Sequence, residues 1–584
     1  MKGFFKTFLA VLLALVVVSL LPFFIIIGMV GSLEPAAPVV GEDSVLVLNL
    51  DESITDSPRM PTFSMSGNNF EMVETLTMLD VATSLDKAAT DPNIEALYIN
   101  FTGTGTVETT AQMEELRGLL VKFKTTSGKP IYAYNETYSQ GTYWLASVAD
   151  RLYMNPQGGL DWRGLASQSL FFKKAIDKLG ADVQIIRHGT YKSAVEPYML
   201  TEMSPANRRQ TEAMVNALWS VLVEDVATAR QIPARTLGEW AATLAIDSPR
   251  KAAELGMVDG LRYEDEVLSE LAQLVGAEEA GLVTLGEYCA SATIPTKVTP
   301  NKVAIIYADG EIIDGEGAEG IVGGATTADQ IRRAREDKGV KAVVLRVNSP
   351  GGSALASEVM WRELKLLQAE KPLVVSMSGY AASGGYYISS PADCIVAGRT
   401  TLTGSIGVFG VVISGKDVLE DKIGVTVDVA KTAPHADMGT LFRPLTSVEL
   451  NYMQRSVEDV YSVFLGHVAE GRDMTVEAVD KIGEGRVWCG SDAERIGLVD
   501  RFGGLQEALA EAAARAELGD DWRVVEILEE DDEMTAMLKS LFSAKMGASA
   551  GDSGVLTEGL RSVVRMLEEG NSVQARMPYD ITIY

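Results

Sequence analysis

The chain repeats itself at the scale of whole domains. Three segments of the first half match three segments of the second half in the same order: Val45–Asp51 with Val303–Asp309, Asp91–Asn100 with Asp337–Arg346, and Ala253–Asp259 with Ala493–Asp500. The offset between matched residues falls from 258 at the first pair to 246 and then 241, as expected for two copies that differ by small loop insertions. Repeats of about 240 residues are long enough for domains and too long for solenoid units. The sequence therefore predicts two homologous domains.

Each copy has the pattern of an α/β fold. Short apolar runs rich in β-branched residues alternate with segments of helical periodicity. In the second half the expected strands are Val303–Tyr307, Ala342–Val347, Leu373–Met377 and Cys394–Ala397, and the expected helices include Thr327–Asp337 and Ala354–Glu370. Strands separated by helices imply parallel βαβ crossovers. We therefore expect a parallel sheet in each domain.

Five segments are expected along the chain. Residues 1–34 form an N-terminal membrane anchor, residues 45–292 the first repeat and residues 301–520 the second. Residues 293–300 contain two prolines without periodicity and form the linker. Residues 521–584 form a C-terminal tail that includes an acidic run and a Gly/Ser-rich run.

The N-terminal segment is typical of a transmembrane helix. Phe8–Val30 is a run of 23 apolar or small residues, enough to cross a hydrocarbon core of about 30 Å. Lys2 and Lys6 precede it, so the positive-inside rule keeps that end in the cytoplasm and places the domains on the outer side of the membrane. A cleaved signal peptide is the rival interpretation, but the run is long for one and lacks a clear small-x-small cleavage site.

Composition excludes several classes of function. The net charge of −29 disfavours nucleic acid as a partner. Three scattered cysteines indicate neither a disulfide framework nor a zinc site, and the three histidines lie in no metal-binding motif. We expect no metal and no cofactor.

A candidate nucleophile is present in one half only. Tyr380–Tyr387 (YAASGGYY) follows an expected strand, and its counterpart in the first half is Ser139–Trp144 (SQGTYW), so that Gln140 stands where Ser383 stands. Ser383 has small neighbours and lies where backbone N–H groups are exposed, which suits acyl transfer. If Ser383 is a nucleophile, its counterpart cannot be one, and the two halves have divided the work.

Two more motifs accompany this serine. Val347–Ser353 (VNSPGGS) ends an expected strand, and Gly351 and Gly352 can turn backbone N–H groups inward as an oxyanion cradle. Thr403–Gly407 (TGSIG) places the hydroxyl of Ser405 22 residues after Ser383. Taken singly, such motifs are commonly turns; together they indicate a catalytic site.

A serine nucleophile needs a base. None of His188, His435 and His467 has an acidic partner that the sequence can assign. A lysine is the other option, and because its free pKa is about 10.4 it must be desolvated to be neutral near pH 7. Such a lysine is expected in an apolar pocket, with hydroxyls to orient it.

The motifs resemble those of a known family. The anchor, the tandem halves, Tyr380–Tyr387, Leu402–Gly407 (LTGSIG) and Gly189–Tyr198 (GTYKSAVEPY) are similar to the long form of the signal peptide peptidase A family, bacterial membrane-anchored serine proteases of peptidase family S49. The resemblance spans roughly residues 1–520. It implies tandem domains of the Clp-protease or crotonase-like fold and a Ser/Lys dyad. In that dyad Ser383 is the nucleophile, Lys192 is the general base, and Ser405 positions the lysine amine. Backbone N–H groups around Gly384 and Gly351–Gly352 would stabilise the oxyanion.

The same resemblance implies partners and location. Substrates would be cleaved signal peptides and other short apolar peptides, the chain would form a closed homotetramer, and the domains would lie on the extracytoplasmic side of the bacterial inner membrane. Three alternatives stay open. Lys431, close to the position that matches Lys192, is a possible base within the second half. A crotonase-type acyl-CoA enzyme and a noncatalytic peptide-binding scaffold are the rival functions.

Overall fold

The computed structural model describes residues 40–50, 52–59, 62–66, 69–73, 75–101, 106–291, 298–529 and 573–576. The predicted anchor and most of the predicted linker lie outside these residues. Within them, no helix combines the length and the apolar character that crossing a membrane requires.

The first half contains a six-stranded sheet in which all neighbours are parallel. Its strands in spatial order are β10 (Gly260–Leu261), β8 (Arg151–Leu160), β7 (Ile131–Tyr138), β6 (Ile94–Asn100), β1 (Ser44–Leu48) and β11 (Gly281–Thr284). The helices of this half are α2 (Met78–Thr90), α3 (Thr110–Ser127), α4 (Gln140–Ala146), α5 (Lys173–Leu179), α6 (Glu196–Met199), α7 (Pro205–Arg230), α8 (Ala234–Thr243), α9 (Pro249–Glu254), α10 (Glu264–Val275) and α11 (Leu285–Ser291). Capping boxes start α2 at Thr77 and α3 at Thr109.

The second half contains an eight-stranded sheet with the same plan. Its main path is β21 (Val487–Cys489), β19 (Leu402–Gly404), β17 (Leu373–Ala382), β15 (Val340–Ser349), β12 (Lys302–Asp309) and β23 (Arg523–Glu526), with β18 (Cys394–Ala397) beside β17 and β22 (Arg501–Phe502) beside β18. The helices are α12 (Gly324–Glu336), α13 (Ala354–Gln368), α14 (Gly384–Ser389), α15 (Ser447–Gly471), α16 (Val476–Ile482), α17 (Gly490–Arg495) and α18 (Leu505–Arg515). The expected boundary at residue 520 leaves out β23, which pairs with β12.

The two sheets confirm the α/β expectation and carry the duplication down to single hydrogen bonds. The order β11–β1–β6–β7–β8–β10 corresponds to β23–β12–β15–β17–β18–β22. Tyr143 donates to the Met257 carbonyl as Tyr386 donates to the Leu498 carbonyl. Because Tyr143 and Tyr386 are equivalent, Gln140 and Ser383 occupy equivalent positions, at an offset of 243.

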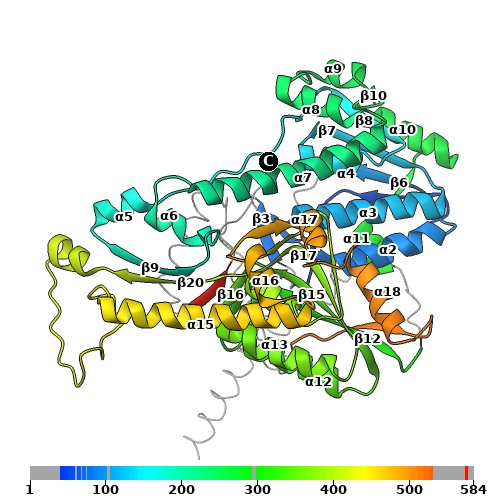
Figure 1. Cartoon of the computed structure of the whole chain (residues 1–584). Coiled ribbons are helices and arrows are strands. Elements are labelled where there is room, and N and C mark those ends of the chain that lie inside the picture. The colour runs from blue at the N-terminus through cyan, green and yellow to red at the C-terminus, as the bar shows by residue number, and fades with distance from the viewer. Residues whose placement is uncertain are drawn as a thin grey trace, which may run out of the picture.

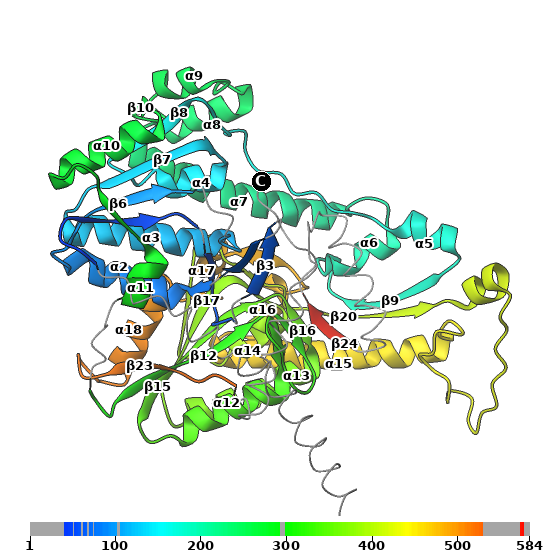
Figure 2. The same ribbon diagram turned by 180° about the vertical axis from the view of Figure 1, so that it is seen from behind.

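A third sheet is shared by the two halves (Figure 2). Its order is β14 (Ile321–Gly323), β13 (Glu311–Ile313), β16 (Gly351–Ser353), β24 (Val573–Arg576), β20 (Val408–Ser414) and β9 (Asp182–His188). β9 comes from the first half and pairs antiparallel with β20 over seven residue pairs, from Val408 opposite His188 to Ser414 opposite Asp182. This ladder extends into an arm with α5 and α6, away from the two main sheets (Figure 1).

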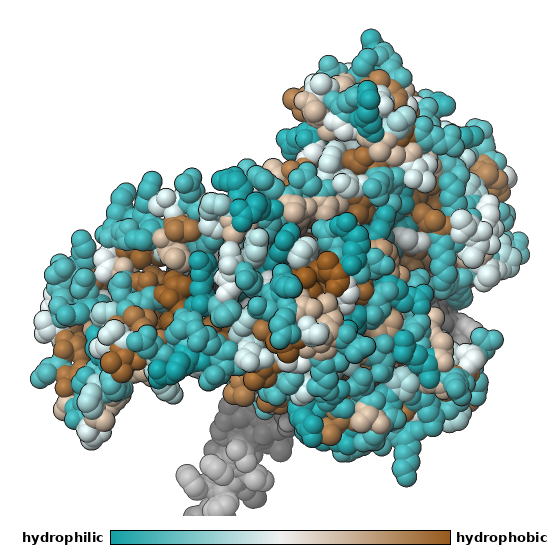
Figure 3. All heavy atoms as spheres, viewed as in Figure 1, coloured by the Kyte–Doolittle hydropathy of each residue, from teal (hydrophilic) through white to brown (hydrophobic). Residues whose placement is uncertain are grey.

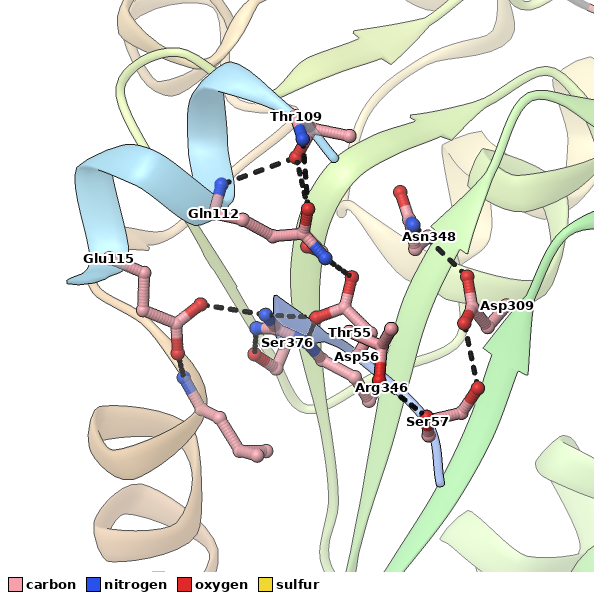
Figure 4. A network of polar contacts seen from close by, with 12 residues as sticks. Thr55, Asp56, Ser57, Thr109, Gln112, Glu115, Asp309, Arg346, Asn348 and Ser376 are labelled. Atoms are coloured by element: carbon pink, nitrogen blue, oxygen red, sulfur yellow. Dashed lines mark hydrogen bonds and ion pairs between the residues drawn. The ribbon is translucent and has the colours of Figure 1, made fainter. Parts of the chain in front are cut away.

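Buried ion pairs also hold the halves together (Figure 4). Arg346 of β15 is fully buried and donates to Asp56 through Nε at 2.8 Å and to Glu115 through Nη2 at 2.6 Å. Gln112 donates to the other oxygen of Asp56 at 2.7 Å. Since Asp56 and Glu115 belong to the first half and Arg346 to the second, this cluster fixes one half on the other.

Candidate active site

Ser383 lies at a sharp turn between β17 and α14. Its φ and ψ are 57° and −113°, a conformation that costs a serine of order 1–3 kcal/mol and is seen mostly where function needs it. The backbone N–H donates to the Gly404 carbonyl at 2.8 Å, and the carbonyl accepts from Tyr387 N–H at 2.8 Å. The side chain does not cap the helix. Its Oγ is left for another partner.

That partner is Lys192. Its Nζ lies 2.7 Å from Ser383 Oγ, and both side chains are fully buried. Burial lowers the pKa of the Lys192 amine well below its usual value, because there is little solvent to stabilise the charged form. The expected contact of a desolvated lysine with the serine is present, and both residues belong to one chain.

Ser405 completes the group. Lys192 Nζ lies 3.0 Å from Ser405 Oγ and 3.1 Å from the Ser405 carbonyl oxygen. Ser405 is fully buried and has a φ of 48°. The Lys192 amine is therefore held between the hydroxyls of Ser383 and Ser405. This is the arrangement expected if Ser405 positions the lysine.

Two glycines make room for the lysine stem. A Cβ at Gly485 would stand 2.6 Å from Lys192 Cβ, and a Cβ at Gly407 would stand 3.3 Å from Lys192 Cδ. Gly485 also has a φ of 77°, which favours glycine. A side chain at Gly485 would therefore force either this turn or the Lys192 backbone to shift.

The lysine loop is fastened to the second half by Gln210 of α7. Gln210 is buried, and its Nε2 donates to the Tyr191 carbonyl at 3.0 Å and to Ser193 Oγ at 2.8 Å. Its Oε1 accepts from Val487 N–H at 3.3 Å. Tyr191 N–H donates to the Glu484 carbonyl at 2.9 Å. The residues on both sides of Lys192 are thus tied to the strand β21 and the turn before it.

The predicted oxyanion glycines lie at two places. Gly384 is the first residue of α14, directly after Ser383. Gly352 lies on β16 with a φ of 154°, and a Cβ there would stand 2.0 Å from the Ile312 carbonyl oxygen, so no larger residue fits. Gly351 N–H donates to Ser349 Oγ at 3.2 Å. The Gly351 N–H thus already has a hydrogen-bond acceptor within its own turn.

The other candidate bases have different partners. Lys431 Nζ lies 2.9 Å from Asp437 Oδ1 on an exposed loop. His435 Nδ1 lies 2.9 Å from Glu449 Oε1, which also binds Arg443. His435 thus has the acidic partner that the sequence could not assign. In the described part of the chain, the amine that contacts Ser383 Oγ is that of Lys192.

The chain is similar to known peptidases. The model of peptidase family S49 matches residues 124–278 and 365–519. "Protease 4" of Salmonella typhi is 39% identical over 492 residues, covering 81% of this chain and 78% of that protein. "Protease 4" of Haemophilus influenzae is 36% identical over 528 residues, covering 87% and 85%. "Serine protease SPPA, chloroplastic" of Arabidopsis thaliana is 31% identical over 554 residues, covering 92% and 78%.

The chain belongs to peptidase family S49. It carries two copies of the S49 domain, and the family consists of serine proteases. In the first copy, Gln140 occupies the position equivalent to Ser383. Its Oε1 accepts from the N–H groups of Arg163 and Gly164 at 2.9 and 2.8 Å, and its Nε2 donates to the Gly164 carbonyl at 3.0 Å. The Gln140 side-chain amide thus bridges the turn at residues 163–164. With the offset of 243, this turn corresponds to residues 406–407, directly after Ser405 in the second S49 copy.

Sequence reasoning missed the residues that shape this S49 site from a distance. Gln210 lies in the second turn of the long helix α7 (Pro205–Arg230), and nothing in the neighbouring sequence distinguishes it from a solvated glutamine. Gly485 lies in the run Gly483-Glu484-Gly485-Arg486, which reads as an ordinary turn. Only the fold brings Gly485 against Lys192, and Gln210 against Tyr191 and Ser193 on either side of it.

Proposed function

We propose that the chain is a membrane-anchored serine endopeptidase with a Ser/Lys dyad. The observation that carries the proposal is the 2.7 Å contact between the desolvated Lys192 amine and Ser383 Oγ. A neutral amine takes the proton of Ser383 as Oγ attacks a peptide carbonyl, and then passes it to the leaving amine. Water enters next, gives its proton to the same lysine and hydrolyses the acyl-enzyme.

The oxyanion would be stabilised by backbone N–H groups. Gly384 follows the nucleophile at the start of α14, where the first N–H groups of a helix have no intrahelical acceptor. Gly352 would supply the second donor from β16, and Gly351 would shape the turn that presents it. Each such donor typically contributes about 10²–10³ in kcat. We assign both copies to the Clp-protease and crotonase-like type of fold, on their parallel-sheet order and these glycine turns.

The substrates we propose are cleaved signal peptides and other short apolar peptides in extended conformation. β24 supports this, because it lies antiparallel to β16, with Gly352 opposite Ala575 (Figure 2). A sheet that accepts an extended chain beside Gly351–Ser353 can accept a substrate in the same way, through main-chain hydrogen bonds. The bound peptide would then run directly past the proposed oxyanion donors.

The N-terminal sequence supports the proposed location, and the family resemblance supports the proposed assembly. Phe8–Val30 would anchor the chain in the bacterial inner membrane, with the S49 domains on the extracytoplasmic side and near the membrane-bound remnants of signal peptides. A homotetramer would enclose the sites and limit access to unfolded peptides. Protease added to intact spheroplasts tests the orientation: digestion of the domains supports it, and full protection contradicts it.

The test of the dyad uses the full-length protein in detergent and a fluorogenic apolar peptide. Ser383→Ala and Lys192→Met are expected to abolish cleavage, while Lys431→Met, a matched change at an exposed lysine, keeps it. After reaction with a peptide ester whose acyl-enzyme hydrolyses slowly, mass spectrometry should find the acyl group on Ser383. Loss of cleavage with Lys431→Met and retention with Lys192→Met would move the base into the second half. A parent protein that cleaves no peptide would favour the noncatalytic scaffold.

A further inference from the structure

A side-chain hydrogen bond joins the two helices that carry the proposed oxyanion glycines at their starts. α13 begins directly after Gly351–Ser353, and α14 begins directly after Ser383. Tyr387 of α14 is buried, and its hydroxyl donates to Glu358 Oε2 of α13. Burial raises the pKa of Tyr387 well above its usual range, so the phenol stays protonated and remains the donor. The contact therefore links the first turns of one helix to the first turn of the other.

His467 of α15 holds the same carboxylate oxygen. Its Nε2 lies 2.9 Å from Glu358 Oε2, and because an ionised carboxylate can only accept, the imidazole is the donor. The His467 ring stacks on Trp361 with the ring centroids 3.5 Å apart, and the Tyr387 ring stands nearly perpendicular to it at 5.3 Å. The Glu358 side chain is 42% exposed, and hydrophilic residues make up most of the surface on the face that shows α15 (Figure 3). The carboxylate thus keeps part of its hydration while it accepts from two helices.

The duplication gives each of these residues a counterpart in the first half. The N-cap residues of α3 and α13 are 244 apart (109 and 353), and those of α7 and α15 are 242 apart (204 and 446). α4 and α14 follow the offset of 243 that relates Gln140 to Ser383. With these offsets, the positions correspond pairwise: Glu114 to Glu358, Trp144 to Tyr387 and Asp225 to His467.

The counterparts in the first half make different contacts. Trp144 Nε1 donates to Asp225 Oδ2 at 3.0 Å. Glu114 turns to the second half, where it accepts from Arg399 Nε at 2.6 Å and from Thr400 Oγ1 at 2.7 Å. Within the part of the chain that the structure describes, no side-chain hydrogen bond joins Glu114 to Trp144. Of the two equivalent helix pairs described, the pair that follows the nucleophile is the one with the direct link.

We propose that Glu358 and Tyr387 position the two oxyanion donors relative to each other. The inference rests on the proposed function, in which the N–H groups of Gly352 and Gly384 bind the same developing oxyanion. Gly352 lies two residues before α13, and Gly384 is the first residue of α14. The distance between the two N–H groups therefore depends on how the two helices pack. Tyr387 N–H also donates to the Ser383 carbonyl at 2.8 Å, so the residue that binds Glu358 holds the nucleophile's backbone as well.

The short helix α14 depends on such contacts for its orientation. It has six residues, too few to be a stable helix by itself. A Cβ at Gly385 would stand 2.6 Å from the Ser349 carbonyl oxygen, so the start of α14 lies directly against the end of β15. Oxyanion donors act at about 2.7–3.1 Å from the oxygen that they stabilise. A small rotation of α14 therefore weakens the donor at Gly384, and the hydroxyl of Tyr387 opposes that rotation.

The test compares catalysis with the binding of a peptide aldehyde to the full-length protein in detergent. Ser383 Oγ adds to the aldehyde carbon, and the former carbonyl oxygen of the hemiacetal then lies where the oxyanion develops. Tyr387→Phe should lower kcat about tenfold and weaken aldehyde inhibition by a similar factor, while KM for a fluorogenic peptide stays within about twofold. Glu358→Ala should have the same effects. Glu358→Gln keeps an oxygen that accepts from Tyr387 and should restore most of the kcat.

Tyr307→Phe is the matched control. Tyr307 of β12 also donates its hydroxyl to a glutamate, Glu526, at 2.6 Å. Its loss should leave kcat and aldehyde inhibition unchanged. The inference is overturned if Tyr387→Phe lowers the unfolding temperature but keeps the parent's kcat and aldehyde inhibition. It is also overturned if Glu358→Gln loses as much kcat as Glu358→Ala. A parent protein that neither cleaves a peptide nor binds the aldehyde would overturn the proposed function, and this inference with it.

Discussion

Lys192 Nζ and Ser383 Oγ lie 2.7 Å apart although 191 residues separate them in the chain. The β9–β20 ladder makes this contact possible. β9 ends at His188, four residues before Lys192, and β20 begins at Val408, three residues after Ser405. Because Val408 pairs with His188, the lysine loop and the Ser405 turn leave the same end of one ladder. Ser383 directly follows β17, whose last residues pair with β19.

Removal of the Ser405 hydroxyl should reduce turnover without preventing binding. Ser405→Ala keeps the carbonyl contact to Lys192 Nζ and loses the Oγ contact at 3.0 Å. A displacement of the amine by about 1 Å typically lowers the rate by roughly 10²-fold. We therefore expect kcat to fall by about that factor while KM stays the same. Steady-state kinetics on a fluorogenic peptide measures both. An unchanged kcat would remove Ser405 from the site.

Lys192 should destabilise the fold near neutral pH. Its pKa is lowered by burial in the folded chain and is about 10.5 when unfolded. Between these two values the unfolded state binds one more proton, so the contribution of Lys192 to stability rises with pH, by up to about 1.4 kcal/mol per pH unit. Lys192→Met should therefore unfold at a higher temperature than the parent at pH 7, and the gap should shrink toward pH 10. Thermal unfolding at both pH values measures it, and a gap that widens with pH would contradict the assigned protonation state.

The sequence predicted the main sheets better than the third sheet. Leu373–Met377 was expected as a strand from its apolar β-branched residues, but β17 continues to Ala382 because Tyr380–Ala382 pair with Leu402–Gly404. The sequence predicts that Gly351 and Gly352 follow a strand, but not that Gly351–Ser353 form a strand of their own, since Ile312 and Ala575, which pair with Gly352, lie far away in the chain. Three-residue strands with distant partners leave no local pattern.

The site was predicted in two unequal parts. The motif around Ser383 could be recognised from its residues and from the duplication. The identity of its base could not, because spacing alone allowed Lys431 as well as Lys192. The resemblance of Gly189–Tyr198 to family motifs pointed to Lys192, and only the three-dimensional ladder explains why that loop reaches the serine.

Gln210 should act on catalysis through the lysine loop. Gln210→Glu has the same shape, but it replaces the donor to the Tyr191 carbonyl and Ser193 with an acceptor. If the loop loosens, water reaches Lys192 and its pKa rises toward the ordinary value, so the acidic limb of the kcat/KM profile should move to higher pH. Profiles of the parent, Gln210→Glu and Gln210→Leu measure the shift. A fall in stability with an unmoved limb would leave Gln210 a purely structural role.

The ion pairs of Arg346 with Asp56 and Glu115, which join the two halves, should contribute to the free energy of unfolding. Arg346→Met leaves Asp56 and Glu115 without their cation, and breaking a buried pair in this way costs about 3–5 kcal/mol. Arg346→Met combined with Asp56→Leu and Glu115→Leu removes the uncompensated charges and should recover much of the loss. Denaturant unfolding of the parent, the single variant and the triple variant tests this. A triple variant no more stable than the single one would contradict the electrostatic account.

Deletion of β24 should strengthen the binding of peptide substrate. β24 lies between β16 and β20, where Gly352 pairs with Ala575 and Phe409 with Gln574. A peptide that binds beside β16 must take this place, so β24 competes with it within the same chain. A chain that ends at residue 572 should therefore have a lower KM for a short apolar peptide and a similar kcat. A synthetic peptide with the sequence of Val573–Arg576 and its neighbours should inhibit the shortened enzyme competitively. If shortening the chain instead lowers kcat and the peptide restores it, β24 completes the site rather than occupying the substrate's place.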